Sequence, residues 1–273
     1  MSGAFDDWMK TVQAGSENDL SGFLPTATTV PAKLHDAMRY ALLGGGKRVR
    51  PLLVYAAGAL FDADPATLAR AAAAVEMIHA YSLVHDDMPC MDDDALQSQA
   101  FLVLSEATGV PASRQVAMLR LLAHASGSAG MCGGQAIDLD SVGLSLTLEQ
   151  LEQMHQLKTG ALLRAAVILG ALAGKDLDAA ELAALNTYAR AIGLAFQVVD
   201  DVLDATADSA TLGKTAGKDA ADNKPTYVSI LGLEPSRALA QTLRLDAHAA
   251  LAPFGDKALR LRELADLIVQ RKA

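Results

Sequence analysis

Apolar residues recur along this chain with the spacing of helices. On a helix, residues three and four positions apart share one face. That spacing dominates over residues 32–43, 65–87, 148–174 and 179–204, and again towards the end of the chain. An alternation of apolar and polar residues, which would indicate a β-strand, is absent over any useful length. The pattern predicts an all-α fold, built as a bundle of helices around a large aliphatic core.

Polar and glycine-rich stretches interrupt the helical pattern at three places. These are residues 44–46, 127–134 and 205–227. Glycine is unfavourable inside a helix, so the second stretch indicates either a break or unusually close helix packing. The third stretch is rich in Gly and Lys and predicts a loop with short helical pieces. A low-complexity linker or a block of like charge would suggest a domain boundary, and neither occurs. We therefore expect one domain over residues 1–273.

Composition supports the prediction of helices and narrows the range of possible partners. Hydrophobic residues make up 51% of the chain and aromatic residues only 4%. Most of the apolar residues are Ala and Leu, which favour helices because they lose little side-chain freedom there. The formal net charge of −9 argues against nucleic acid as a partner, because binding phosphate backbones needs clustered cations. An anionic substrate would meet an acidic protein, unless bound divalent cations lay between them.

The chain shows few signs of export or of a membrane. Its two cysteines, Cys90 and Cys132, are too few for a disulfide framework, which fits a reducing compartment. The first ten residues lack the basic and apolar regions of a secretory signal. The most apolar run, residues 165–173, is much shorter than the roughly 20 residues that a membrane span needs. We expect a cytoplasmic protein without a membrane span.

An acidic cluster lies within an apolar helical stretch near residue 200. Asp200 and Asp204 are four positions apart and Asp201 and Asp204 three apart, so the three carboxylates share one helix face. Like charges placed in this way destabilise an isolated helix. Hard oxygen ligands that converge on one face are what Mg²⁺ selects. A solvated acidic face is the simpler alternative, but the apolar residues 192–199 before the cluster disfavour it.

Another acidic cluster, the first in chain order, follows residues 79–85. Asp86 and Asp92 are six apart and lie on different faces of a regular helix, whereas Asp93 would align with Asp86. Pro89 can kink or end the helix, so the geometry stays open. His79 precedes Asp86 by seven positions and shares its face. Alone, His79 could equally be a core histidine with a satisfied hydrogen bond.

A basic element lies near the start of the chain. Three glycines at 44–46 are followed by Lys47, Arg48 and Arg50. Glycine permits close backbone approach, and arginine offers forked donors that match phosphate oxygens. The spacing is not that of a P-loop. Taken alone, a helix cap with solvated charges would explain the element as well.

Together these elements carry a family resemblance. GGGKRVRP, HAYSLVHDDMPCMDD and FQVVDDVLD, in this order and separation, resemble the motifs of the trans-isoprenyl diphosphate synthases. The similarity extends to residues 158–160, 212–215 and 222–227, and covers the chain from about residue 32 to residue 272. The resemblance implies an all-α, isoprenoid-synthase-type bundle around a deep central cavity, usually a homodimer. The two acidic clusters are expected to face each other across the mouth of that cavity.

The resemblance also implies roles for individual residues. About two or three Mg²⁺ ions, for which Mn²⁺ can substitute, would bind the allylic diphosphate. Their ligands would be Asp86, Asp87, Asp92, Asp200, Asp201 and Asp204. The diphosphate of isopentenyl diphosphate would bind to Gly46, Lys47, Arg50 and His79. The allylic substrate, dimethylallyl or geranyl diphosphate, would contact Lys158, Lys214 and Lys224. Thr159 and Gln197 would stabilise the allylic cation, so Lys158, Thr159 and Gln197 are the expected catalytic residues.

The residues before the first acidic cluster imply the length of the product. In this family they form the floor of the cavity, and a bulky side chain there stops chain growth. Tyr81 and Ser82 occupy those positions, and Tyr81 lies five residues before Asp86. The expected product is farnesyl diphosphate. A geranylgeranyl or geranyl diphosphate synthase and a non-catalytic partner subunit stay open as alternatives. A terpene cyclase is disfavoured, because it needs no basic site for isopentenyl diphosphate.

One departure from the family pattern concerns substrate binding. The family continues its first cluster with Asp-Asp-Leu-Arg-Arg-Gly and a mobile loop, whereas residues 91–94 here run directly into Ala95 and Leu96. Compared with the family pattern, this sequence lacks about twenty residues at that point, a length typical of a lid loop. They include an arginine pair that grips diphosphate in the family. We expect a mobile loop to be missing between about Asp93 and Ala95. If the segment were truly deleted, substrate binding would be badly impaired.

Overall fold

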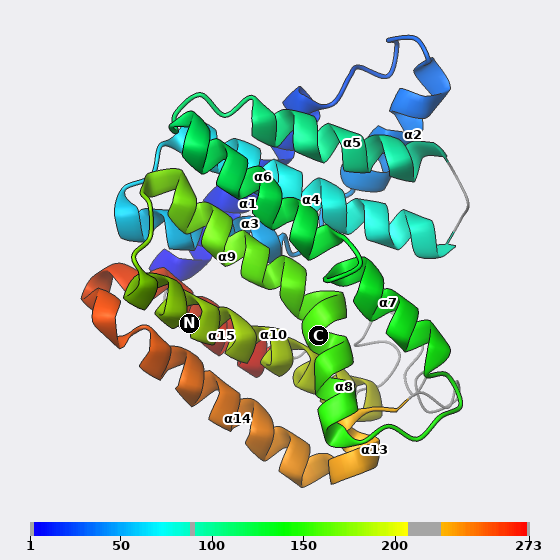
Figure 1. Cartoon of the computed structure of the whole chain (residues 1–273), viewed down its shortest axis with the longest axis vertical. Helices are drawn as coiled ribbons and strands as arrows, with labels where there is room; N and C mark the ends of the chain where they lie inside the picture. The colour runs from blue at the N-terminus through cyan, green and yellow to red at the C-terminus, as the bar shows by residue number, and fades with distance from the viewer. Residues whose placement is uncertain (1–2, 88–90, 207–224, 272–273) are drawn as a thin grey trace. The chain divides into compact units, whose positions relative to one another are not determined.

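The computed structural model describes residues 3–87, 91–206 and 225–271, and the side chains of residues 85–93 lie outside the described part. Helices dominate those residues, and no β-strand occurs among them (Figure 1). The all-α prediction is confirmed. The chain groups into two compact units. Unit 1 is Met1–His124 with Ala165–Ala179, and unit 2 is Ala125–Arg164 with Ala180–Ala273. The single domain stays a prediction, and each unit is described by itself.

Unit 1 contains the long helices of the first half of the chain. In chain order its elements are α1 (Gly3–Phe23), α2 (Ala32–Leu42), α3 (Val49–Gly58), the 3₁₀ turn η1 (Ala59–Phe61), α4 (Pro65–Asp87), α5 (Met91–Ser105) and most of α6 (Ala112–Ser126). Most of α9 (Ala161–Gly174) joins them. Helices α4 and α5 run side by side (Figure 1).

Local chemistry explains where α4 begins and how α3 packs. Asp64 caps α4, because its Oδ2 accepts the Thr67 backbone N–H at 2.9 Å and Pro65 follows at the first helical position. At Gly170 of α9, an added Cβ would collide with the backbone carbonyl of Val54 in α3. The absence of a side chain there lets two helix backbones meet, and this contact lies in an aliphatic core.

Unit 2 contains the second acidic cluster. Its elements are α7 (Met131–Asp140), α8 (Leu148–His155), the π-helical turn η2 (Gln156–Gly160), α10 (Ala179–Thr206), α13 (Tyr227–Leu231), α14 (Leu233–Ala250), the 3₁₀ segment η3 (Ala252–Ala258) and α15 (Leu259–Gln270). Capping boxes begin two of these helices: Thr147 with Gln150 at α8, and Thr226 with Ser229 at α13. The core around α8, α10 and α13 consists of Leu151, Met154, Val198, Val199, Tyr227 and Ala240.

The helix bounds follow the expected pattern closely, with one informative difference at the start of α5. Residues 65–87 form one helix as expected. The glycine-rich stretch 127–134 contains both a break, since α6 ends at Ser126 and α7 begins at Met131, and a close packing contact at Gly134. Helix α5 begins at Met91, so the junction expected between Asp93 and Ala95 lies inside a continuous helix.

Two helical stretches are long and apolar enough to cross a membrane by length and composition alone. They are Leu148–Gly174 and Ala179–Thr206, and 56% of the tested window in each is buried inside the structure. Core helices of soluble proteins pass the same test, so this is weak evidence for a span.

Candidate active site

The basic turn connects α2 to α3 in unit 1. Gly45 and Gly46 have φ angles of +81° and +117°, a region that favours glycine because it carries no Cβ. A Cβ at either position would meet no atom within 4 Å, so the backbone of the turn is open on that side. The glycines are therefore required by the backbone conformation, and they leave room for a ligand.

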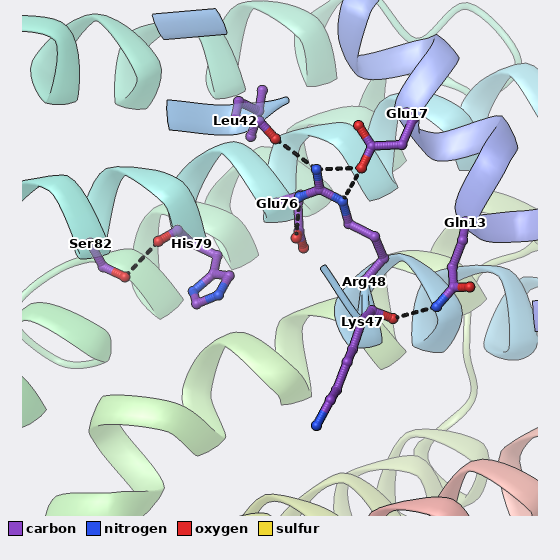
Figure 2. A network of polar contacts seen from close by, with 8 residues as sticks. All are labelled: Gln13, Glu17, Leu42, Lys47, Arg48, Glu76, His79 and Ser82. Carbon is purple, nitrogen blue, oxygen red and sulfur yellow. Dashed lines mark hydrogen bonds and ion pairs between the residues drawn. The ribbon is translucent and has the colours of Figure 1, made fainter. Parts of the chain in front are cut away.

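Two adjacent cations of the turn have opposite surroundings. Lys47 is exposed, and its side chain extends away from the polar network around Arg48 (Figure 2). Arg48 is only 7% exposed. It donates from Nε to Glu17 at 2.7 Å, from Nη1 to Glu76 at 2.9 Å and from Nη2 to the Leu42 carbonyl at 2.7 Å. Arg48 is an internal anchor, while Lys47 is exposed, and its role in substrate binding stays a prediction.

Arg50 and His79 form the half-buried side of the basic site. Burial lowers the pKa of the Arg50 guanidinium, and its Nε has no hydrogen-bond partner in the described part of the chain. Burial, followed by the nearby Arg50 and Arg48, lowers the pKa of His79 to about 3. His79 is therefore a neutral imidazole near pH 7. An anion would satisfy the orphaned Arg50 donor, which is the property expected of a diphosphate site.

The expected floor of the cavity lies on α4, beyond His79. Tyr81 is 8% exposed, and the Ser82 hydroxyl donates to the His79 carbonyl at 2.7 Å. The Ser82 hydroxyl is thus occupied by its own helix. Asp86 and Asp87 lie in the last turn of α4 and Asp92 in the first turn of α5, but their side chains fall outside the described part.

The second acidic cluster is not a solvated face. Asp201 and Asp204 are only 7% and 6% exposed. The Asp201 Oδ2 accepts the backbone N–H of Tyr227 at 2.7 Å. The Asp204 Oδ1 is buried and has no hydrogen-bond partner in the described residues. Burying a carboxylate oxygen without a partner is costly, so this atom fits a site that a cation would complete.

Asp200, the third carboxylate, has a cationic partner that the sequence did not indicate. The Arg271 Nη2 donates to Asp200 Oδ1 at 2.6 Å and to the Phe196 carbonyl at 2.8 Å. The Arg271 guanidinium also lies 3.9 Å from the centre of the Phe196 ring, where the aromatic face attracts a cation. Arg271 directly follows α15 and precedes Lys272 in the sequence. No spacing rule could have linked it to Asp200.

The donor set of this cluster fits a hard divalent cation. Asp200, Asp201 and Asp204 supply only carboxylate oxygens, which Mg²⁺ prefers. Among the residues that the structure describes, no ready-made group of three acidic, His or Cys ligands occurs. Tyr227 and Arg271 each donate to one oxygen of a carboxylate, Asp201 Oδ2 and Asp200 Oδ1. These residues would hold Mg²⁺ through the remaining oxygens.

The expected catalytic residues of unit 2 lie on or beside the π-helical turn η2. The Lys158 ammonium contacts Asp138 Oδ2 of α7 at 2.7 Å, and the Thr159 hydroxyl donates to Gln197 Oε1 of α10 at 2.9 Å. An added Cβ at Gly134 would collide with the Lys158 backbone nitrogen. π-Helical turns are frequent at functional sites. Sequence reasoning linked Thr159 with Gln197 but did not include Asp138.

A buried aromatic pair lies behind the acidic helix. His155 and Tyr227 stack with ring centres 5.6 Å apart. Both imidazole nitrogens and the tyrosine hydroxyl are buried without a hydrogen-bond partner in the described part. Burial lowers the pKa of His155 to about 4, with Asp138 raising it and Lys158 lowering it by smaller amounts. Neither residue was expected at the site. Lys214 and Lys224, the remaining predicted ligands, lie outside the described residues.

Comparison with known proteins identifies the family to which this chain belongs. The chain belongs to the polyprenyl synthetase family, whose model matches residues 31–97 and 91–252. A farnesyl diphosphate synthase of Escherichia coli (strain K12) is 46% identical to it over 280 aligned positions, which cover 92% of this chain and 94% of the relative. The heterodimeric geranylgeranyl pyrophosphate synthase large subunit 1 of Arabidopsis thaliana chloroplasts is 45% identical, over 89% of this chain and 73% of the relative.

Solved structures agree with this assignment. An FPP/GFPP synthase from Zymomonas mobilis has a TM-score of 0.87 and 37% sequence identity, and the match covers 98% of this chain and 100% of that chain. The resemblance seen in the motifs is thereby confirmed over nearly the whole chain.

Proposed function

We propose that this chain is a Mg²⁺-dependent prenyltransferase that condenses isopentenyl diphosphate with dimethylallyl and geranyl diphosphate to give farnesyl diphosphate. The observation that carries the proposal is the buried acidic cluster of α10, where Asp204 Oδ1 has no hydrogen-bond partner among the described residues. An acidic protein can bind a diphosphate at such a cluster only through cations. The E. coli and A. thaliana relatives, both prenyl diphosphate synthases by name, support the same reaction.

Unit 1 supplies the features expected of the isopentenyl diphosphate site. The open glycine backbone, the exposed Lys47 and the orphaned Arg50 donor are suited to a diphosphate. The neutral His79 adds a hydrogen-bond donor without a further charge. These groups bind the substrate whose double bond acts as the nucleophile.

Unit 2 supplies the features expected for the allylic diphosphate. Mg²⁺, when bound by Asp200, Asp201 and Asp204, would neutralise charge that develops on the leaving diphosphate. We assign the binding of a phosphate oxygen to the Lys158 ammonium, which contacts Asp138 Oδ2 at 2.7 Å. We assign the stabilisation of positive charge on carbon to the Thr159 backbone and Gln197, and the Thr159 hydroxyl donates to Gln197 Oε1.

The reaction balances without any further co-reactant. The C–O bond of the allylic diphosphate breaks and leaves an allylic cation. The double bond of isopentenyl diphosphate attacks that cation and forms a C–C bond. A proton then leaves the adjacent carbon for the departing diphosphate. Tyr81, buried on α4, is the proposed floor that limits the product to fifteen carbons. We further propose that the protein is a cytoplasmic homodimer without a membrane span.

A second candidate, a non-catalytic subunit of a prenyl synthase, is favoured by one observation. Helices α4 and α5 are separated by only three residues, 88–90. The alignment with the E. coli enzyme spans 280 positions, more than the 273 residues of this chain, so the relative carries residues that have no counterpart here. The two family matches meet at residues 91–97. We infer that the arginine-containing segment expected after the first acidic cluster is absent from this chain.

One experiment separates the two candidates. The full chain is incubated with isopentenyl and geranyl diphosphates, with and without Mg²⁺, and the products are identified by chromatography. A Mg²⁺-dependent C15 product is expected from the synthase. A C20 product would keep the reaction but refute Tyr81 as the floor. Absence of condensation, with isopentenyl diphosphate still bound in a calorimetric titration, would identify a non-catalytic subunit.

A further inference from the structure

Arg48 has an unusual backbone conformation for its residue type. Its φ and ψ angles are 49° and 41°, in the left-handed region, and it immediately precedes α3. A residue with a Cβ loses roughly 1–2 kcal/mol in this region, so surrounding contacts must hold it there. Asp62 is the other non-glycine residue with positive φ in the described part of the chain. Arg48 lies between Lys47 and Arg50, so its conformation sets the direction of both neighbours.

The contacts that hold Arg48 come from three different elements. Glu17 belongs to α1, Leu42 ends α2 and Glu76 lies in α4 (Figure 2). The side chains of Arg48 and Glu76 are each 6% exposed, so this ion pair is shielded from water. Three directed contacts of a planar guanidinium fix both its position and its orientation, which an ammonium group would not achieve.

Helix α1 holds the turn at a second point. The Gln13 side chain donates to the Lys47 backbone carbonyl at 2.9 Å. Gln13 and Glu17 are four residues apart, on one face of α1, so one helix face contacts two successive residues of the turn. On α4, Glu76 and His79 are three residues apart and share a face in the same way. The network therefore connects the basic turn to the helix that carries His79.

We propose that Arg48 is a positioning residue: its buried contacts with Glu17 and Glu76, together with the Gln13 contact to Lys47, fix the turn so that Lys47 and Arg50 bind the diphosphate of isopentenyl diphosphate. This inference rests on the proposed function, because it assigns that ligand to the basic turn. Arg48 itself does not contact the substrate. Each of its three guanidinium nitrogens donates to a protein acceptor, so of the three cations Lys47, Arg48 and Arg50 only Arg48 is assigned to internal contacts.

The proposal is tested by direct binding, which does not depend on turnover. Isopentenyl diphosphate alone is titrated calorimetrically into the full-length wild-type chain and into the Arg48→Lys, Gln13→Ala and Arg39→Lys variants. Arg39→Lys is the matched control, because Arg39 also bonds to α1, at Ser21, without touching the basic turn. Melting curves first confirm that each variant is folded at the titration temperature.

We expect the affinity to fall about tenfold in Arg48→Lys and about threefold in Gln13→Ala, with Arg39→Lys as wild type. Gln13 is part-exposed, so its variant keeps the test available if Arg48→Lys does not fold. In steady-state assays, KM for isopentenyl diphosphate should rise while KM for geranyl diphosphate and kcat stay within about twofold.

The outcomes separate this inference from the proposed function. Wild-type affinity in both Arg48→Lys and Gln13→Ala would overturn the positioning role, even if the enzyme makes farnesyl diphosphate. An equal rise in KM for both substrates would also overturn it, since that indicates a general structural effect. Weakened binding in a chain that shows no turnover would uphold the positioning role and refute the synthase. Absence of binding to the wild type would refute both.

Discussion

The basic turn of unit 1 and the acidic helix of unit 2 each hold several like charges close together, positive in the turn and negative in the helix. In the turn, Arg48 is directed inward onto Glu17 and Glu76, which leaves Lys47 outward. In α10, Arg271 pairs with Asp200, and a backbone N–H binds Asp201. Each cluster of like charge thus has an opposite partner behind it, which lowers the cost of keeping the cluster together.

The two regions differ in what fixes their geometry. The turn depends on its own backbone: two glycines and Arg48 take positive φ angles within four residues, 45–48. The acidic helix has regular backbone, and its carboxylates are oriented by Tyr227 and Arg271 from remote parts of the chain. Substitutions in the turn should therefore act through conformation, and those around α10 through packing and charge.

The largest effect is expected when the buried Asp204 carboxylate of α10 loses its charge. Asp204→Asn keeps the shape of the side chain but removes an anionic oxygen from the proposed Mg²⁺ site. We expect kcat to fall by about 10³-fold at saturating Mg²⁺. Steady-state assays measure the change, and Asp246→Asn on exposed α14 provides a same-unit control. Wild-type activity in Asp204→Asn would remove Asp204 from the site.

The second prediction compares glycines of the two regions. Gly134→Ala would push a Cβ into the Lys158 backbone, which cannot move aside cheaply, so we expect the free energy of unfolding to fall by about 3 kcal/mol. Gly45→Ala meets open space and suffers only backbone strain at φ +81°, at a cost of about 1 kcal/mol. Urea unfolding of the two variants measures the difference. A larger loss of unfolding free energy in Gly45→Ala than in Gly134→Ala would mean that backbone strain outweighs packing at these two positions.

The third prediction concerns the partner of Asp200. Arg271→Ala removes the 2.6 Å ion pair and leaves that carboxylate free to turn, so the Mg²⁺ concentration for half-maximal activity should rise about tenfold. Arg271→Lys keeps the charge and should recover part of the loss. Metal titrations of activity measure both variants. An unchanged Mg²⁺ requirement in Arg271→Ala would show that Asp200 needs no such support.

Much of the fold could be predicted from the sequence, because helix formation here depends on local signals. The helix over residues 65–87 follows from its apolar spacing and from Pro65. The family resemblance gave Thr159 and Gln197 the same role, and the hydrogen bond between their side chains is a contact that it did not specify.

The partners behind the charged clusters could not be predicted in this way. The sequence separates Arg271 from Asp200 by 71 positions and Arg48 from Glu76 by 28, and no periodicity rule spans such distances. Arg48 is directed inward from a backbone with a positive φ angle. A positive φ angle at a non-glycine residue cannot be predicted from the residue type. Charge pairs formed across a fold depend on tertiary packing, and motif spacing does not record them.

The smallest predicted effect concerns the histidine buried in each region, His79 near the turn and His155 behind α10. The pKa of His155 falls from 6.5 to about 4, mainly through burial, with Asp138 and Lys158 facing the ring and Tyr227 stacked on it. Unfolded protein binds a proton at His155 as the pH drops below 6.5, whereas folded protein does so only near 4. The contribution of the neutral His155 to the free energy of unfolding is therefore complete above pH 6.5 and is lost as the pH falls from 6.5 towards 4.

His155→Phe should remove this loss while preserving the stack on Tyr227. We expect the difference in unfolding free energy between about pH 7 and pH 5 to shrink by about 1 kcal/mol. Urea unfolding at the two pH values measures it, with His124→Phe as a control whose side chain is exposed. His79, with its pKa lowered to about 3, keeps part of the acid sensitivity in unit 1. An unchanged pH dependence in His155→Phe would mean that the acidic region tolerates a charged imidazole, unlike the basic one.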